Sequence, residues 1–223
     1  MAKPAPPRPA PRLYLATPAV DDPSTLLAAL PQLLAGADVA AVLLRLAPSD
    51  PRTLITRIKA LTGVVQAAGA ALLLDGHAEL VARGGADGAH LSGLAALQEW
   101  LPQLQPARIA GVGMLETRHD SMIAGEAGAD YVLFGEPAGD GTRPSAEAIA
   151  DRLNWWAELF EPPCVGYATS RDEVEEFAAA GADFVLVGEH IWADASGPAA
   201  ALAEAEAALK LGFAGTASTP ARG

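Results

Sequence analysis

The tripeptide Gly-Ala-Asp occurs four times in this chain, each time between a helix-like run and a short strand-like run. The copies begin at Gly36, Gly85, Gly128 and Gly181, which lie 49, 43 and 53 positions apart. Glycine can take the left-handed conformation that ends a helix, and aspartate favours the turn that follows. Each copy therefore marks a point where a helix ends and a strand begins.

The spacing of the copies is too long for one strand-plus-helix unit and suits two such units. Four doubled units predict a single α/β domain, a (β/α)8 TIM barrel whose functional residues lie on the loops after the strands. The expected strands are 13–17, 39–45, 71–75, 88–93, 108–113, 131–136, 164–167 and 184–189. A doubly wound open sheet is the alternative, but the segment after the first strand lacks a G-x-G-x-x-G loop.

Helical patterns are clearest over 24–35, 51–68, 117–127, 145–160, 171–180 and 198–210. The expected N-caps are Ser24, Asp50, Thr117, Ser145 and Ser170. The barrel is expected to occupy residues 12–211. A Pro-rich tail over 1–11 and a flexible tail over 212–223 should flank it as short disordered segments.

The chain has 223 residues, of which 51% are apolar, and a formal net charge of −12. This length suits one domain with a large core. No apolar stretch approaches the roughly 18–20 residues of a membrane span, so we expect no membrane insertion. The negative charge argues against nucleic acid or an acidic membrane as a general partner.

Three residue types exclude classes of chemistry. Cys164 is the only cysteine, which excludes an internal disulfide and fits a cytoplasmic protein. The four histidines show no metal-binding spacing, so a zinc site is not expected. No lysine stands at the end of an expected strand, which argues against Schiff-base chemistry.

Several polar residues stand at the ends of the expected strands and are candidates for a site. Arg45 follows an apolar strand, so it either forms an ion pair, with Asp75 as the candidate partner, or clamps an anion. Asp75 either holds Mg²⁺ or substrate, or caps the segment that starts at Gly76. His90 alternates with apolar neighbours and is expected to be a hydrogen-bonded inward histidine.

The turn Gly139-Asp140-Gly141-Thr142-Arg143 is the best candidate for a phosphate-binding loop. Its two glycines expose backbone N–H groups, and a hydroxyl and a guanidinium stand beside them. A surface turn rich in glycine has the same composition, so this turn is a candidate for either role.

Six motifs span roughly residues 12–193: RLYLAT, LLR, LLLDGHAEL, GADGAHL, AGADYVLFG and AGADFVLV. Together they resemble the family of thiamine phosphate synthases and thiazole tautomerases. The resemblance implies a TIM barrel that joins a pyrimidine methyl pyrophosphate to a thiazole phosphate with Mg²⁺ and releases pyrophosphate. It also implies a small phosphorylated ligand and a possible homodimer.

The resemblance assigns roles to individual residues. Arg45 and Asp75 would be catalytic, with Asp75 also a metal ligand. The substrate and its phosphate would be bound by Thr142, Arg143, Gly166, Thr169 and Gly188. The ends of the expected strands add the other residues at the mouth, which are His90, Gly113, Glu136, Tyr167 and Glu189.

The chain departs from the family pattern at several of these places. Leu43, Ala47, Leu74 and Ala95 replace the family's glutamine, lysine, asparagine and second metal-binding aspartate. Glu136 and Glu189 put carboxylates near the expected phosphate. One carboxylate 4 Å from a phosphate charge costs about 1 kcal/mol in water and about 4 kcal/mol at an effective dielectric near 20.

Three hypotheses follow from this pattern. The first is a thiamine phosphate synthase with a rearranged site. The second is a degenerate paralogue that binds a related heterocycle or another small metabolite without the synthase reaction. The third is a structural or regulatory barrel that acts through a protein surface.

Overall fold

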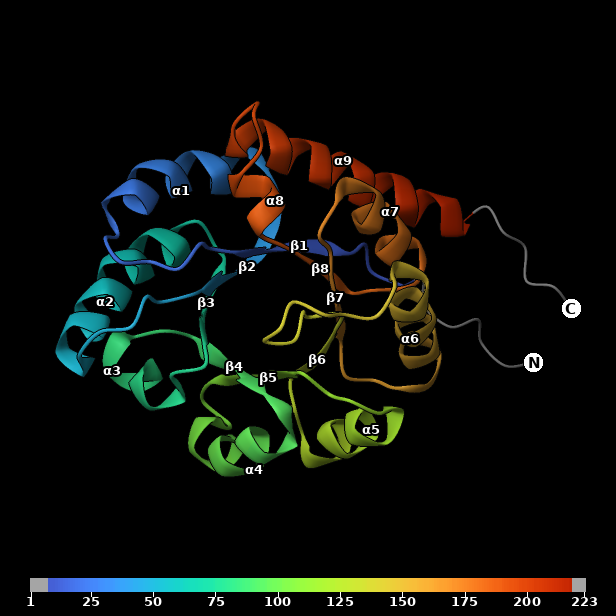
Figure 1. Cartoon of the computed structure of the whole chain (residues 1–223), viewed down its shortest axis with the longest axis horizontal. Helices are drawn as coiled ribbons and strands as arrows, with labels where there is room; N and C mark the ends of the chain where they lie inside the picture. The colour runs from blue at the N-terminus through green and yellow to red at the C-terminus, as the bar shows by residue number, and fades with distance from the viewer. Residues whose placement is uncertain (1–7, 218–223) are drawn as a thin grey trace, which may run out of the picture.

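The computed structural model describes residues 8–217, in which eight parallel strands close into one barrel (Figure 1). The strands are β1 (Arg12–Ala16), β2 (Val39–Leu44), β3 (Ala71–Asp75), β4 (Gly88–Ser92), β5 (Ile109–Gly113), β6 (Tyr131–Phe134), β7 (Cys164–Tyr167) and β8 (Phe184–Val187). Each strand pairs with its neighbours in sequence, and β8 pairs with β1. The predicted TIM barrel is confirmed, and the open-sheet alternative is wrong.

Helices surround the barrel on its outside (Figure 1). They are α1 (Ser24–Gly36), α2 (Pro51–Ala67), η1 (Ala78–Leu80), α3 (Val81–Gly84), α4 (Gly93–Leu104), α5 (Arg118–Ala127), α6 (Ala146–Leu159), α7 (Arg171–Ala179), α8 (Glu189–Trp192) and α9 (Pro198–Ala217). Within the described part of the chain, no helix is both long and apolar enough to cross a bilayer.

The core has two layers because successive strand residues point to opposite faces of the sheet. Tyr14, Leu73 and Tyr131 belong to the inner cluster that fills the barrel. Leu15 and Leu72, one position away on the same strands, belong to the outer cluster between barrel and helices. The inner layer forms the floor below the residues at the strand ends.

The Gly-Ala-Asp repeat has the predicted role in three of its four copies. Gly85, Gly128 and Gly181 have φ of 78°, 101° and 103°, the left-handed conformation that ends a helix. Gly36 is still part of α1, and Ala37 after it is extended, with φ of −148°. The first copy therefore joins helix to strand without the left-handed turn.

The aspartates of the last three copies share a contact that the sequence did not predict. Each carboxylate accepts the N–H of a residue at or near the start of the preceding strand, so it ties two neighbouring strands together. The pairs are Asp87 with Leu72 (2.7 Å), Asp130 with Ala110 (2.8 Å) and Asp183 with Cys164 (2.8 Å). Asp38, in the first copy, instead accepts from the side chain of Arg12.

Four of the five expected N-caps are confirmed by bonds from their side chains to helix N–H groups, at Asp50, Thr117, Ser145 and Ser170. The prediction for Ser24 is wrong, because Pro23 is the N-cap of α1 and Ser24 is the first residue of the helix. Ser24 instead donates its N–H to the Asp22 carboxylate.

The ends of the barrel differ from the expected bounds. Arg8, in the segment expected to be a tail, forms a 3.0 Å ion pair with Asp183. Helix α9 continues to Ala217, beyond the expected limit at 211. The glycine at 212 lets α9 approach α7 closely, because a Cβ there would overlap the carbonyl of Glu175. The remaining tail residues, 1–7 and 218–223, lie outside the described residues.

Candidate functional site

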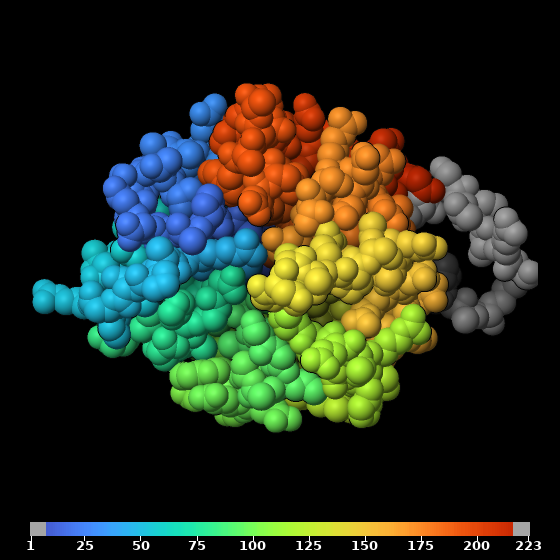
Figure 2. Space-filling model, in the orientation of Figure 1, coloured from blue at the N-terminus to red at the C-terminus, as the bar shows by residue number. Residues whose placement is uncertain are grey.

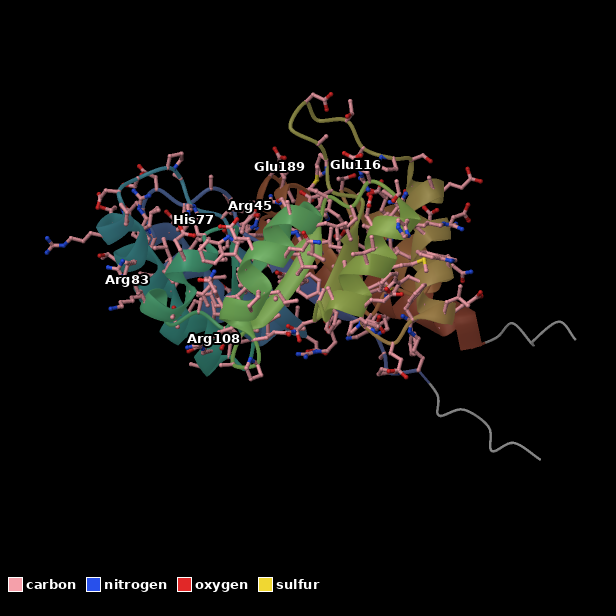
Figure 3. The ribbon with its side chains drawn as sticks, turned by 90° about the horizontal axis from the view of Figure 1, so that it is seen from below. Arg45, His77, Arg83, Arg108, Glu116 and Glu189 are labelled. Carbon is pink, nitrogen blue, oxygen red and sulfur yellow. The ribbon has the colours of Figure 1, made fainter. Side chains whose placement is uncertain are left out.

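The candidate site lies at the end of the barrel where the strands finish, which we call the mouth. Figure 3 places Arg45, His77, Glu116 and Glu189 at this edge and Arg108, which precedes β5, at the opposite edge. Since all strands are parallel, their carboxyl ends meet at one edge. The connection from β6 to α6, yellow in Figure 1, extends across the barrel opening, and its atoms cover part of this face in Figure 2.

Arg45 and Asp75 form an ion pair at the ends of β2 and β3, with 3.1 Å between Nε and Oδ2. The two strands pair in register up to Leu44 and Leu74, so the next residues lie side by side. The ion-pair interpretation of Arg45 is confirmed, whereas its role as an anion clamp stays a prediction. Asp75 does not cap the following helix, because η1 has His77 at its N-cap and no side-chain capping bond.

A cavity of about 470 Å³ opens beside this ion pair, lined by Thr17, Arg45, Glu189 and Trp192 among others. Thr17 Oγ1 accepts the N–H of Arg45 at 3.1 Å, and the Trp192 indole donates to the carbonyl of Ala16 at 2.7 Å. The side chain of Arg45 is 29% exposed and lies 5.9 Å from the centre of the Tyr167 ring. Its guanidinium is therefore fixed while part of it still faces the cavity.

His90 and Glu136 form a second pair deeper in the mouth, with 3.0 Å between Nε2 and Oε1. His90 is fully buried, and the side chain of Glu136 is 13% exposed. The Tyr131 hydroxyl lies 3.0 Å from the other nitrogen of His90, and Tyr131 in turn bonds to Tyr14 at 3.1 Å. The predicted hydrogen-bonded, inward histidine is confirmed.

The pKa values of His90 and Glu136 favour their charged forms. Burial opposes the charge of His90, but the Glu136 carboxylate outweighs it and raises the histidine pKa. Burial likewise opposes the charge of Glu136, and His90 together with the N–H of Met114 outweighs it and lowers the carboxyl pKa. Each partner therefore favours the charged form of the other.

Gly113 provides the space that Glu136 occupies. A Cβ at position 113 would overlap Glu136 Oε2 and come within 2.9 Å of His90 Nε2. The next residue, Met114, has φ of 52°, a left-handed conformation rare for such a side chain, and donates its N–H to Glu136 Oε2 at 3.0 Å. A carboxylate from the loop after β6 thus takes the place of a side chain from β5.

Of Thr142 and Arg143 in the predicted phosphate loop, only Arg143 reaches the end of β7. Thr142 donates both its hydroxyl and its N–H to the carboxylate of Asp140, at 2.6 and 2.9 Å, and is exposed. Arg143 instead reaches the end of β7, where it donates to Thr169 Oγ1 at 2.8 Å and to the carbonyl of Tyr167 at 2.9 Å. Arg143 and Thr169 therefore come together as predicted, and Thr142 turns toward its own loop.

Glu173, which was not predicted, holds this second arginine. Its carboxylate lies 3.0 Å from Arg143 Nη1 and accepts the N–H of Thr169 at 2.7 Å. The signal was available in the sequence, because Ser170 and Glu173 form the Ser-x-x-Glu pattern of a helix N-terminus. The carboxylate in that pattern usually bonds back to the N-cap, whereas here it turns to Arg143 and Thr169.

A second cavity, of about 390 Å³, lies between the loops after β5 and β6. Its lining includes Met114, Glu136, Thr142, Arg143 and Arg152. Glu189 lines the cavity beside Arg45 instead, so the two carboxylates that were expected to act together face different spaces.

The two predicted glycines lie in different surroundings. Gly166 is in β7, and a Cβ there would contact Leu153 and Phe177 of the helical layer. Gly188 precedes α8 and lies near Ala16 and Tyr167 at the mouth. Of the two glycines, only Gly188 therefore lies where a Cβ would contact residues at the mouth.

Metal-binding groups are sparse among the described residues. Within residues 8–217, no three histidine, cysteine, aspartate or glutamate side chains gather where they could hold a metal ion. Each oxygen of Glu136 already has one partner, His90 for Oε1 and Met114 for Oε2. Asp75 is the predicted metal ligand. One carboxylate can serve Mg²⁺ when substrate phosphates supply further oxygens.

Comparison with known proteins gives a consistent result. The family described as thiamine monophosphate synthase matches residues 13–191. The thiamine-phosphate synthase of Rhodospirillum centenum is 37% identical over 201 residues, 86% of this chain and 95% of that protein. That of Hyphomonas neptunium is 35% identical over 213 residues, 91% and 95% of the two chains.

Among solved structures, thiamine phosphate pyrophosphorylase from Pyrococcus furiosus has a TM-score of 0.72 at 19% identity, covering 91% of this chain and 96% of that one. The 3-hexulose-6-phosphate synthase from Salmonella typhimurium has a TM-score of 0.69 at 19% identity, covering 89% and 98%. At this identity these likenesses support the barrel fold alone.

Proposed function

Because this chain belongs to the thiamine monophosphate synthase family, we propose that it is a thiamine-phosphate synthase of thiamine biosynthesis. It joins hydroxymethylpyrimidine pyrophosphate to thiazole phosphate and releases pyrophosphate. The observation that carries the proposal is the Arg45–Asp75 pair beside a cavity of about 470 Å³ at the mouth.

Departure of pyrophosphate from the pyrimidine requires cations at the site more than a protein nucleophile. When pyrophosphate leaves the pyrimidine, negative charge grows on the leaving group, and fixed cations stabilise that charge without reorganising. Arg45 is held by Asp75 on one side and by the Tyr167 ring on the other. Its fixed position is what this step needs, since a mobile arginine would have to be ordered first.

Arg143 is the candidate for binding the thiazole phosphate. Its Nε is buried and has no hydrogen-bond partner among the described residues. A buried donor without a partner costs about 1–3 kcal/mol, which a phosphate oxygen would recover. Gly188 and Thr169 lie near the same strand ends, so the phosphate would be bound between the loops after β7 and β8, a common phosphate site in such barrels.

Asp75 is the residue that would hold Mg²⁺, together with oxygens of the pyrophosphate. When bound, the metal would neutralise charge on the leaving pyrophosphate. Asp75 already keeps Arg45 in place. One carboxylate therefore orients the arginine and offers its remaining lone pairs to a cation.

Pyrophosphate release tests the proposal. The wild-type protein should release pyrophosphate only when both substrates and Mg²⁺ are present, and Arg45→Ala should slow release by about 100-fold or more. A wild-type rate no higher than that of Arg45→Ala would overturn it. The protein should be compared at equal folded concentration, which circular dichroism checks.

A second candidate is favoured by one observation, that Glu136 fills the place of a β5 side chain and pairs with His90. In this alternative the barrel binds a related heterocycle or another small metabolite and does not join the two substrates. Calorimetry separates the candidates, because tight binding of both phosphorylated substrates would count against the second one.

A further inference from the structure

Glu136 is the least expected group in the mouth, and its geometry is fully determined. It follows β6, yet its carboxylate lies over Gly113 at the end of β5 and bonds to His90 on β4. Three strands therefore converge on one carboxylate. Such convergence keeps the group in a single orientation, which is what selective ligand recognition requires.

The Glu136 carboxylate is held by His90 and Met114 and also borders a cavity. Oε1 faces His90 and Oε2 accepts from Met114, which uses two of the roughly four acceptor positions that a carboxylate has. The exposed 13% of the side chain lines the cavity of about 390 Å³. Acceptor capacity therefore remains on a rigid group beside an open space.

His90 is itself supported, so the carboxylate cannot easily turn away. Its ring stacks on Tyr131 at 5.8 Å with 9° between the planes, and its second nitrogen bonds to the Tyr131 hydroxyl. Tyr131 bonds onward to Tyr14 inside the barrel. This chain of buried groups extends from the barrel interior to the cavity and ends at Glu136.

The cavity carries opposite charges on its walls. Glu136 contributes a carboxylate, and Arg143 and Arg152 contribute guanidinium groups. Arg152 is fixed by bonds to the carbonyls of Leu115 and Glu116, at 3.1 and 3.3 Å. The Glu136 wall therefore suits a group that presents N–H donors, and the arginine wall suits an anionic group.

We propose that Glu136 is a specificity-determining residue that binds the donor edge of an amino-substituted nitrogen heterocycle carrying a phosphate. An exocyclic amine presents N–H donors, which match the acceptor positions that His90 and Met114 leave free on the carboxylate. The phosphate faces Arg45, which the proposed function assigns to the pyrophosphate of the pyrimidine and whose charge acts on Glu136. This inference rests on the proposed function in taking an aminopyrimidine phosphate as the ligand.

The test uses two probes on the full-length protein, a 4-aminopyrimidine with a 5-phosphooxymethyl group and its counterpart with hydrogen in place of the amine. Titration calorimetry measures the ratio of their dissociation constants. The wild-type protein should bind the amino probe about 10- to 100-fold more tightly, because the other probe shields the carboxylate from water without donating a hydrogen bond to its free acceptor positions. Equal affinities for the two probes would overturn the proposal, whatever any variant does.

Glu136→Gln extends the test, and Glu147→Gln is its matched control. The control removes the same charge from an exposed position in the first turn of α6, outside the cavity lining. Glu136→Gln should reduce the preference for the amine to within about threefold and leave the affinity for the other probe unchanged. Glu147→Gln should keep the wild-type ratio. Equal weakening of both probes by Glu136→Gln would mean that Glu136 only holds the loop, and would overturn the proposal.

Pyrophosphate release, measured on the same preparation, separates this inference from the proposed function. Turnover without a preference for the amine would overturn the inference and leave the synthase proposal standing. A preference for the amine without turnover would overturn the synthase proposal and leave the inference about Glu136 standing.

Discussion

Glu136 Oε1 lies 3.0 Å from His90 Nε2 at the centre of the barrel mouth, although 46 positions separate the two residues in the chain. The contact exists because Gly113, between them, has no side chain. The pair therefore depends on a third residue, Gly113, which contributes space and no side-chain contact.

Gly113→Ala is expected to destabilise the protein by about 1–3 kcal/mol, because the added methyl overlaps Glu136 Oε2 and forces it away from His90. Urea unfolding measures the effect. Gly139→Ala is the control, since no atom lies within 4 Å of a Cβ there. Glu136→Ala in the Gly113→Ala background should recover part of the loss. Equal stability of the two glycine variants would contradict the packing argument.

The stabilisation from the His90–Glu136 pair should depend on pH in a defined window. The pKa of His90 is raised above 6.5, so its contribution is complete below pH 6.5 and is lost as pH rises through the folded value. The pKa of Glu136 is lowered below 4.5, so its contribution is complete above pH 4.5 and is lost as pH falls through the folded value. The difference in unfolding free energy between wild type and Glu136→Gln should be largest between these limits. A difference that does not change with pH would show that the pair is not ionic.

Arg143→Ala should cost about 1–3 kcal/mol of unfolding free energy, because it leaves the carboxylate of Glu173 without its charged partner. The two side chains are 15% and 16% exposed. Arg171→Ala removes an arginine that is 64% exposed and 3.6 Å from Glu204, and should change stability by less than about 0.5 kcal/mol. Equal losses in the two variants, measured by urea unfolding, would argue against a structural role for the Arg143 pair.

The aspartates of the repeat should differ in importance. Asp130→Ala removes the acceptor for the N–H of Ala110 and should destabilise by about 1–2 kcal/mol. Asp38→Ala removes an exposed ion pair with Arg12 and should cost about 0–1 kcal/mol. Thermal unfolding of the two variants compares them directly. A larger loss for Asp38→Ala would refute the assignment of strand-tying bonds to the later copies.

The sequence predicted the fold because the repeat marks where strands begin and a barrel orders those strands by sequence. The same logic predicted Arg45 beside Asp75, since they end neighbouring strands at the same level. It could not predict Glu136 beside His90. That pair depends on empty volume at Gly113 and on the path of a loop, and neither follows from residue spacing.

The side chains of Thr142 and Arg143 in the predicted phosphate loop bond to different parts of the fold, which residue spacing also could not predict. Thr142 and Arg143 are adjacent in sequence, but the short side chain of Thr142 is satisfied locally by Asp140. The long side chain of Arg143 reaches Thr169 and Glu173 on the next unit of the barrel. Composition identified the turn, and side-chain length decided which residue reaches the end of β7.

The most direct test of the central claim is the stoichiometry of the joined product. When both substrates and Mg²⁺ are supplied, mass spectrometry should detect thiamine phosphate in a 1:1 ratio with released pyrophosphate, and omission of thiazole phosphate should abolish both signals. Pyrophosphate release without joined product, or no release while both substrates bind, would contradict the assignment of the synthase reaction to this barrel.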